Sequence, residues 1–124
     1  MRTSRRIADM DKITIQDLEV NAQIGVTEAE RAQLQRLLIT VEMERDLAEA
    51  GRTDMESATT PYDVVADLIR QVVTERPRKL IEAVAEEVAA AILSRRLAVA
   101  VTIEVKKFSI PHSQYVSVQI RRTQ

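Results

Sequence analysis

The chain contains no cysteine and no tryptophan, and it has only one histidine, one phenylalanine and two tyrosines. Without cysteine it can form neither a disulfide nor a thiolate zinc site, and it has no thiol nucleophile. The single histidine, His112, lies in a polar stretch without a second ligand nearby in the sequence, so it is interpreted as a solvated loop residue. No metal site is predicted. So few aromatic rings cannot form an aromatic cage, and ligand contacts are expected from backbone groups and carboxylates.

The sequence also lacks an excess of either charge and any long apolar run. Its 18 basic and 19 acidic side chains nearly balance, whereas binding to a phosphate backbone usually demands a basic excess. No apolar run approaches the roughly 20 residues that span a bilayer. We therefore expect neither a nucleic-acid partner nor a membrane partner. The lack of cysteine is compatible with a cytoplasmic location, which is our expectation.

The 124 residues provide room for one domain, which we place at residues 12–124. Residues 1–11 contain Arg2, Arg5 and Arg6 without an apolar stretch behind them, which is not typical of a secretory signal. They are expected to form a flexible N-terminal extension. Met10 leads directly into the first apolar segment, so a start of translation at Met10 is an alternative to Met1.

Four segments with alternating apolar residues predict β-strands. The segments are residues 13–24, 37–43, 99–107 and 116–120. The first has an irregular pattern at Asp17 and Leu18, which indicates a bulge, and it ends at Gly25. The first two strands are expected to pair antiparallel. Residues 46–58 and residues 108–114 are predicted to be loops.

Two segments with apolar residues three and four positions apart predict helices. The first begins at Thr60-Pro61, where a hydroxyl caps the helix and proline takes its first position, and it ends at Pro77. The second covers residues 79–94. The order β-β-α-α-β-β predicts an α+β fold, an antiparallel sheet with both helices packed on one face. Its edge strands would be unpaired in one subunit, so we expect the sheet to close against copies of itself.

Lys107 is the candidate functional residue that the strand pattern itself identifies. The apolar residues of segment 99–105 share one strand face, and Lys107 is next on that face. A partly desolvated ammonium there would suit proton transfer near neutral pH. The alternative is a lysine whose stem reaches water past the strand end. Lys106 lies on the opposite face and is interpreted as an ordinary solvated lysine.

Three more polar residues are candidates, and each also has a structural explanation. Glu30 follows Thr27 by three residues, a capping-box spacing that predicts a short helical turn and explains the carboxylate by itself. Tyr62 lies in the first turn of a helix, where tyrosine is commonly a half-buried packing residue. Glu82 lies early in the second helix, where the helix dipole favours a carboxylate.

These candidates lie in five segments that resemble dihydroneopterin aldolases in order and spacing. The segments are residues 25–31 (GVTEAER), 46–54 (DLAEAGRTD), 59–62 (TTPY), 80–86 (LIEAVAE) and 105–107 (VKK). The resemblance covers Asp11 to Arg122, nearly the whole chain. It implies a tunnelling fold, in which four subunits join their sheets into a β-barrel and two such rings stack as a homo-octamer. It also implies that the active site lies between neighbouring subunits.

The resemblance further implies the reaction. A dihydroneopterin aldolase cleaves the side chain of 7,8-dihydroneopterin and releases glycolaldehyde, which leaves 6-hydroxymethyl-7,8-dihydropterin, a precursor of folate. The pterin ring of the substrate is the electron sink. Such a carbon–carbon lyase needs no metal, no Schiff base and no cofactor.

By this resemblance the catalytic residues are Lys107, Tyr62 and Glu30. Lys107 would transfer protons between substrate and water. Tyr62 of a neighbouring subunit would assist at the side-chain hydroxyl, and Glu30 would hold the network of lysine, water and substrate. Glu82 would accept two hydrogen bonds from the pterin. The substrate-binding set is Glu82, Ile81, Pro61 and Tyr62.

Three positions depart from the family pattern. Phe108 stands where proline commonly follows the lysine, Ser117 replaces a frequent glycine, and Ile24 stands where many relatives have histidine. The first two changes concern the surroundings of Lys107. Two alternatives to the aldolase are a dihydroneopterin triphosphate epimerase on the same scaffold and a catalytically silent paralogue that binds pterin.

Overall fold

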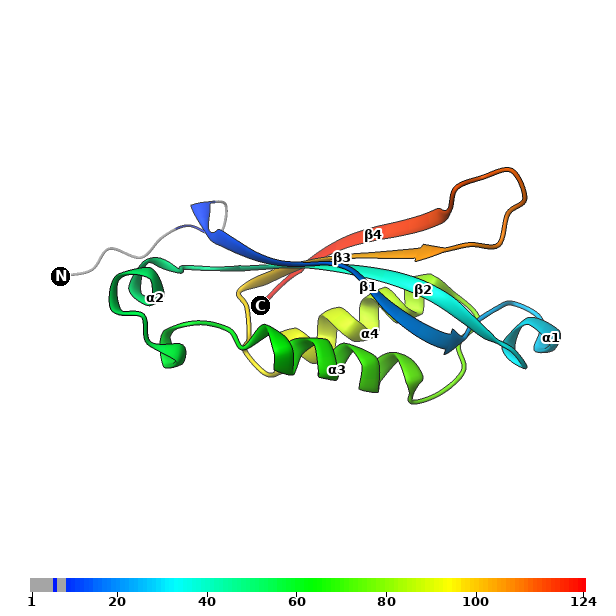
Figure 1. Cartoon of the computed structure of the whole chain (residues 1–124), viewed down its shortest axis with the longest axis horizontal. Coiled ribbons are helices and arrows are strands. Elements are labelled where there is room, and N and C mark those ends of the chain that lie inside the picture. The colour runs from blue at the N-terminus through cyan, green and yellow to red at the C-terminus, as the bar shows by residue number, and fades with distance from the viewer. Residues whose placement is uncertain (1–5, 7–8) are drawn as a thin grey trace.

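Alternating apolar side chains place four strands in one sheet, and two amphipathic helices cover the apolar face of that sheet (Figure 1). The computed structural model describes residue 6 and residues 9–124. In chain order the elements are β1 (Asp11–Gln23), α1 (Glu28–Arg31), β2 (Leu34–Arg45), α2 (Ala48–Thr53), the 3-10 turn η2 (Glu56–Ala58), α3 (Tyr62–Thr74), α4 (Ile81–Ser94), β3 (Ala100–Lys107) and β4 (Val116–Thr123). The predicted α+β fold is confirmed.

The sheet has the order β1-β2-β3-β4, and each neighbouring pair is antiparallel. The predicted bulge is confirmed, because the register of β1 shifts between Ile15 and Leu18. Asp17 in the bulge has a φ of 51°, and its backbone N–H donates to Thr40 Oγ1 at 2.9 Å. The bulge keeps the apolar residues on both of its sides facing the helices. In the described chain, β1 and β4 are the edges of the sheet.

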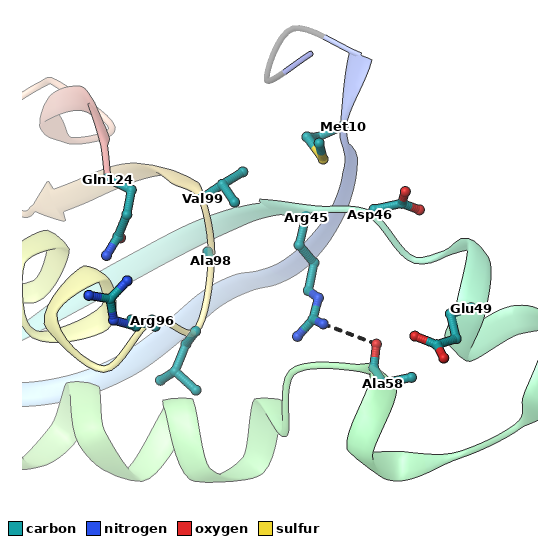
Figure 2. A pocket seen from close by; sticks show the side chains of 10 residues that line it. Met10, Arg45, Asp46, Glu49, Ala58, Arg96, Ala98, Val99 and Gln124 are labelled. Carbon is teal, nitrogen blue, oxygen red and sulfur yellow. Dashed lines mark hydrogen bonds between the residues drawn. The ribbon is translucent and has the colours of Figure 1, made fainter. Parts of the chain in front are cut away.

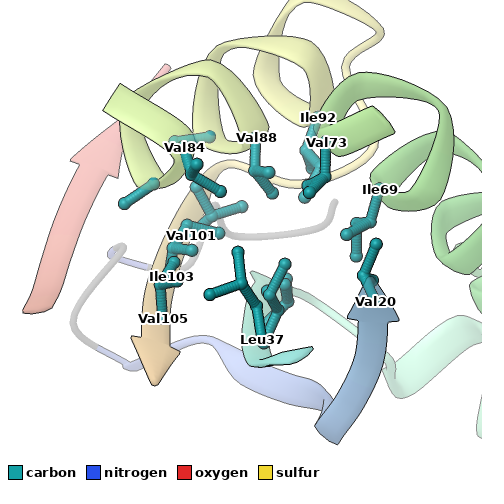
Figure 3. Packing of buried hydrophobic residues seen from close by; sticks show 14 of the residues in the cluster. Val20, Leu37, Ile69, Val73, Val84, Val88, Ile92, Val101, Ile103 and Val105 are labelled. Carbon is teal, nitrogen blue, oxygen red and sulfur yellow. The ribbon is translucent and has the colours of Figure 1, made fainter. Parts of the chain in front are cut away.

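The hydrophobic core lies between the helix-facing side of the sheet and the helices α3 and α4 (Figure 3). Val101, Ile103 and Val105 of β3 are fully buried there, as the alternation in the sequence predicts. They meet buried residues of the two helices and of the other strands, which include Val20, Leu37, Ile69, Val73, Val84, Val88 and Ile92. The opposite face of the sheet is polar. Lys107 therefore extends the apolar face of β3 to its end.

The segment 46–58, which the sequence predicts to be a loop, contains α2 and η2. Asp46 Oδ1 accepts a hydrogen bond from the backbone N–H of Ala48 at 2.9 Å, which satisfies one free donor at the start of α2. Asp54 ends this helix in the left-handed conformation with a φ of 57°. The loop prediction was wrong because a helix this short has no apolar period for the sequence to show.

The start of α3 also differs from the prediction. The helix begins at Tyr62, with Pro61 as its N-cap and no side-chain cap. The Thr60 hydroxyl instead donates to the carbonyl of Leu97 at 2.6 Å and accepts from Arg45 Nη1 at 3.0 Å. A tertiary hydrogen bond at a buried position outcompetes the local cap. The second helix begins at Ile81 rather than at residue 79.

Most of the flexible extension predicted at residues 1–11 lies outside the described residues. β1 already begins at Asp11, whose carboxylate accepts a hydrogen bond from the backbone N–H of Leu47 at 3.0 Å. Among the helices of the described chain, none combines the length and the apolar character needed to cross a membrane.

Candidate functional site

Lys107 and Glu30 lie together at the end of the sheet where β3 finishes. Lys107 pairs with Leu37 of β2, and its side chain is only 13% exposed. Lys107 Nζ lies 3.4 Å from Glu30 Oε2. The two residues are 77 positions apart in the sequence. The fold thus joins a cation and a carboxylate at the rim of the apolar face.

Glu30 is held in place by the predicted capping box of α1, which is confirmed. The backbone N–H of Glu30 donates to Thr27 Oγ1 at 3.2 Å, while the backbone N–H and the hydroxyl of Thr27 donate to Glu30 Oε1 at 3.4 Å and 3.3 Å. Because Thr27 engages Oε1, the other oxygen, Oε2, is directed to Lys107. The same carboxylate therefore serves as a cap and as the partner of the lysine.

The electrostatics favour a charged carboxylate at Glu30. The backbone hydrogen bond from Thr27 lowers the pKa of Glu30 below its ordinary value, and the charge of Lys107 lowers it further, against a desolvation effect that raises it. At neutral pH Glu30 is therefore ionised. It can accept hydrogen bonds from the lysine, from water or from a bound hydroxyl.

Gly25 makes the position of Glu30 possible. A Cβ atom on Gly25 would lie 2.2 Å from Glu30 Cβ, and the glycine φ of 156° is one that other residues rarely adopt. Arg31 Nη1 donates to the carbonyl of Gly25 at 2.9 Å and so closes the turn between β1 and α1. Only glycine allows the strand end and the carboxylate to approach this closely.

Ile81 and Glu82 begin α4 at the same end of the molecule. The preceding Arg78 pairs with the end of β1, since its backbone N–H donates to Gln23 at 3.1 Å and its carbonyl accepts from Gly25 at 3.0 Å. Ile81 is buried at 7% exposure, and the Glu82 side chain is exposed. The first turn of α4 thus presents the Glu82 carboxylate near the turn that carries Glu30.

Arg78 is a residue of this region that the sequence did not reveal. It is 4% exposed, its Nε donates to Glu87 Oε2 at 2.6 Å, and its guanidinium also donates to the carbonyls of Val72 and Val73. The hydrogen bond from Arg78 lowers the pKa of Glu87. In the sequence Arg78 is one of several charged residues near Pro77, so no local pattern marks it as buried.

Lys106 is not the solvated lysine that the sequence predicts. Its side chain is 14% exposed, and Nζ lies 2.9 Å from Asp17 Oδ1 on the polar face of the sheet. The prediction was wrong because the bulge at Asp17 brings a carboxylate across the sheet, a contact between residues 89 positions apart.

Pro61 and Tyr62 lie at the start of α3, and Figure 1 shows that this start is the end of the helix farther from the end of β3. Thr60, just before them, bonds to Arg45, which pairs with Asp11 at the far end of β1. The 13 residues of α3 rise by about 20 Å between this end and the Lys107 end. The Tyr62 side chain is 63% exposed. One subunit therefore does not bring Tyr62 to Lys107.

A hollow of about 390 Å³ also lies at the end opposite to Lys107 (Figure 2). Its lining includes Arg45, Asp46, Glu49, Arg96 and Gln124, and none of the predicted site residues belongs to it. In the described part of the chain, no group of three or more histidines, cysteines or carboxylates is placed to hold a metal ion.

The two glycines provide a matched test of the turn at Gly25. Gly25→Ala should lower the free energy of unfolding by about 1–3 kcal/mol, because it strains the backbone and displaces Glu30. Gly51→Ala should change it by at most about 1 kcal/mol, since an added Cβ meets nothing within 4 Å. Urea denaturation followed by circular dichroism measures both. Equal midpoints for the two variants would contradict the close approach at Gly25.

Comparison with known proteins places this chain in a family. The sequence model of the FolB dihydroneopterin aldolase family matches residues 13–121. The chain is 40% identical over 85 residues to a dihydroneopterin aldolase of Methylorubrum extorquens, a match that covers 68% of this chain and 65% of that protein.

Two solved structures share the fold over nearly their whole length. A putative dihydroneopterin aldolase (FolB) of Vibrio cholerae has a TM-score of 0.90 and 32% identity, with 94% of this chain and 99% of that chain covered. Escherichia coli dihydroneopterin aldolase in complex with neopterin has a TM-score of 0.87 and 32% identity, with 91% and 99% covered. The chain therefore belongs to the dihydroneopterin aldolase family.

Proposed function

We propose that this chain is a dihydroneopterin aldolase of folate biosynthesis, which cleaves 7,8-dihydroneopterin into 6-hydroxymethyl-7,8-dihydropterin and glycolaldehyde. The observation that carries the proposal is the pair of Lys107 Nζ and Glu30 Oε2 at 3.4 Å, at the end of the molecule where α4 presents Glu82. Support also comes from the E. coli relative with neopterin bound, which shares the fold. An aldolase activity agrees with membership of the family.

The reaction is a retro-aldol cleavage that balances without an outside oxidant or reductant. The hydroxyl on the middle carbon of the side chain loses its proton and becomes the aldehyde of glycolaldehyde. The bond to the carbon next to the ring breaks, and its electron pair passes into the imine of the dihydropterin ring. Protonation of that carbon then completes the product. The protein needs to remove one proton and return one proton.

We assign this proton transfer to Lys107, which would move protons between the substrate and a water molecule. Glu30, which is held by Thr27, orients the ammonium and remains ionised because its pKa is lowered. The Glu82 carboxylate accepts two hydrogen bonds from the pterin, one from the amino group of the pterin and one from a ring nitrogen. Ile81 forms an apolar floor beside it, as its burial supports.

The proposed reaction uses neither a metal nor a Schiff base. Both devices serve to stabilise a carbanion, and the dihydropterin ring already does so by accepting the electron pair.

We propose that Tyr62 and Pro61 enter the site from a neighbouring subunit. Exposed apolar side chains support this arrangement, because they lie at both ends of the molecule. Met55, Tyr62 and Val64 are 58%, 63% and 51% exposed at one end. Val26, Leu34 and Leu80 are 63%, 70% and 50% exposed around the turn with Glu30 and the start of α4.

Contact between unlike ends is head-to-tail association, which closes into a ring if the rotation allows it. Joining the free edges of β1 and β4 of successive subunits would make a continuous barrel of the four-stranded sheets. We propose a tetrameric ring of this kind and stacking of two rings into an octamer. Each interface would then place Tyr62 of one subunit against Lys107 and Glu30 of the next.

Incubation with 7,8-dihydroneopterin tests the proposed activity directly. We expect equimolar glycolaldehyde and 6-hydroxymethyl-7,8-dihydropterin, identified by chromatography and mass spectrometry. The rate should be unchanged in EDTA, and borohydride added during turnover should leave no adduct on the protein. Release of an epimer without glycolaldehyde would identify an epimerase instead. A rate lost in EDTA and restored by zinc would contradict the metal-free mechanism.

Lys107→Ala should lower kcat by about 10²- to 10⁴-fold, the usual contribution of general acid and base catalysis. The side chain lies at the rim of the core, so the variant should keep its fold and assembly. Lys12→Ala, on the exposed polar side of β1, is the control and should retain the parent rate. Lys106→Ala is not a suitable control, because Lys106 is bonded to Asp17. A Lys107→Ala variant with the parent rate would remove the lysine from the mechanism.

Mixed oligomers test the shared site. Tyr62→Phe and Lys107→Ala should each be slow alone, but their mixture after joint refolding should regain about a quarter of the parent activity. Random assembly gives that fraction of interfaces an intact tyrosine from one variant and an intact lysine from the other. Mixing the two variants without refolding is the control and should restore nothing. A refolded mixture no faster than the mean of its parents would contradict a site at the interface.

A further inference from the structure

The two residues that flank Lys107 are both anchored on the polar face of the sheet. Lys106 Nζ lies 2.9 Å from Asp17 Oδ1 and 4.8 Å from the centroid of the Tyr115 ring. The Phe108 ring lies under the guanidinium of Arg36, with 4.2 Å from Cζ to the ring centroid. Tyr115 also contacts Phe108 edge to face, with 6.4 Å between centroids and 69° between ring planes. One tyrosine ring thus touches the residue before Lys107 and the residue after it.

The anchor of Lys106 is itself fixed. Asp17 lies in the bulge of β1, its backbone N–H donates to Thr40 Oγ1 at 2.9 Å, and the Thr40 hydroxyl lies 3.3 Å from Asp17 Oδ1. The contact therefore crosses β1, β2 and β3. The hydrogen bond with Lys106 lowers the pKa of Asp17, and the same bond raises the pKa of Lys106, so both are charged at neutral pH.

Lys107 needs such support because of its place in the chain. It is the last residue of β3, and its ladder partner Val116 is the first residue of β4. Strand ends open more readily than strand centres, which would let the ammonium move away from Glu30. Tyr115 contacts Lys106 and Phe108 on the sheet face opposite to the Lys107 side chain, and these contacts hold the ends of β3 and β4 together. They involve the residues on both sides of Lys107 and so restrain its backbone.

We propose that Lys106, Phe108 and Tyr115 form an aromatic clamp that positions Lys107 for proton transfer, with Tyr115 as the positioning residue at its centre. The inference rests on the proposed function of Lys107. It also gives Phe108, which stands where the family commonly has proline, a physical role: a stacked ring restrains the strand end that a proline would otherwise stiffen. Because the clamp lies behind the strand, it affects the lysine rather than the binding of the pterin.

Steady-state kinetics test the clamp with three variants of one loop. Tyr115→Ala should lower kcat by about 10- to 100-fold, since small displacements of a catalytic group have effects of this size, and should change KM by less than about 2-fold. Tyr115→Phe should keep the parent kcat, because the contacts use the ring. Ile110→Ala is the matched control, as Ile110 is 55% exposed in the same loop. Asp17→Asn, which weakens the anchor of Lys106 and spares the rings, should lower kcat in the same direction.

Three kinetic outcomes would overturn the clamp. A Tyr115→Phe variant as slow as Tyr115→Ala would assign a role to the hydroxyl. A raised KM with the parent kcat would place Tyr115 in contact with the substrate. A Tyr115→Ala variant with the same kinetics as Ile110→Ala would show that the Tyr115 ring does not affect catalysis. Circular dichroism and the oligomeric state confirm that the variants compared are folded.

A second measurement does not depend on catalysis. Brief acetylation with an N-hydroxysuccinimide ester, read by peptide fragmentation, should label Lys107 several-fold faster in Tyr115→Ala than in the parent, Tyr115→Phe or Ile110→Ala. Exposed Lys12 is the internal reference. Unchanged labelling would overturn the clamp even in an active aldolase. Increased labelling in a protein that does not cleave 7,8-dihydroneopterin would support the clamp and reject the proposed function instead.

Discussion

The buried guanidinium of Arg78 is the contact on which the functional end of this molecule depends. Its side chain binds Glu87 of α4 and the last carbonyls of α3, while its backbone pairs with Gln23 and Gly25 at the end of β1. A buried charge is tolerated only where it is paired and hydrogen-bonded. Separating Arg78 from these partners would therefore have a large free-energy cost. The strand, the two helices and the turn that carry the candidate residues are thereby fixed to one another.

At this end of the molecule, contacts within the turn after β1 position the candidate site residues. Gly25 lets the turn come close enough for Glu30, Thr27 takes one carboxylate oxygen, and the other is left for Lys107. A helix cap and an ion pair are often alternative explanations of a glutamate, and here one carboxylate does both. The N-terminus of α4, which carries Glu82, lies at the same end of the molecule. The remaining parts, Tyr62 and Pro61, lie at the far end of α3, which is why the proposed site needs a second subunit.

Much of the fold and part of the site could be predicted from the sequence, because they depend on local periodicity. The alternation along β3 correctly placed Lys107 on the apolar face, and the spacing of Thr27 and Glu30 correctly predicted the capping box. The helix α2 was missed, since a helix of six residues leaves no apolar period. Lys106 was predicted to be solvated because alternation shows which face of the sheet a residue lies on, but not which side chain it contacts there. The structure shows that its partner is Asp17.

The sequence by itself determined the order of the four strands and the two long helices, the bulge in β1 and the buried faces, because these follow from patterns within a few neighbouring residues. It also determined the family resemblance, through five short segments in a fixed order. Only the tertiary structure decided the contacts between distant segments: Glu30 with Lys107, Asp17 with Lys106, and Arg78 with Glu87. It also decided that the Thr60 hydroxyl donates a hydrogen bond to the carbonyl of Leu97 and does not cap α3. Such pairs depend on register and twist across the whole sheet, which no single segment encodes.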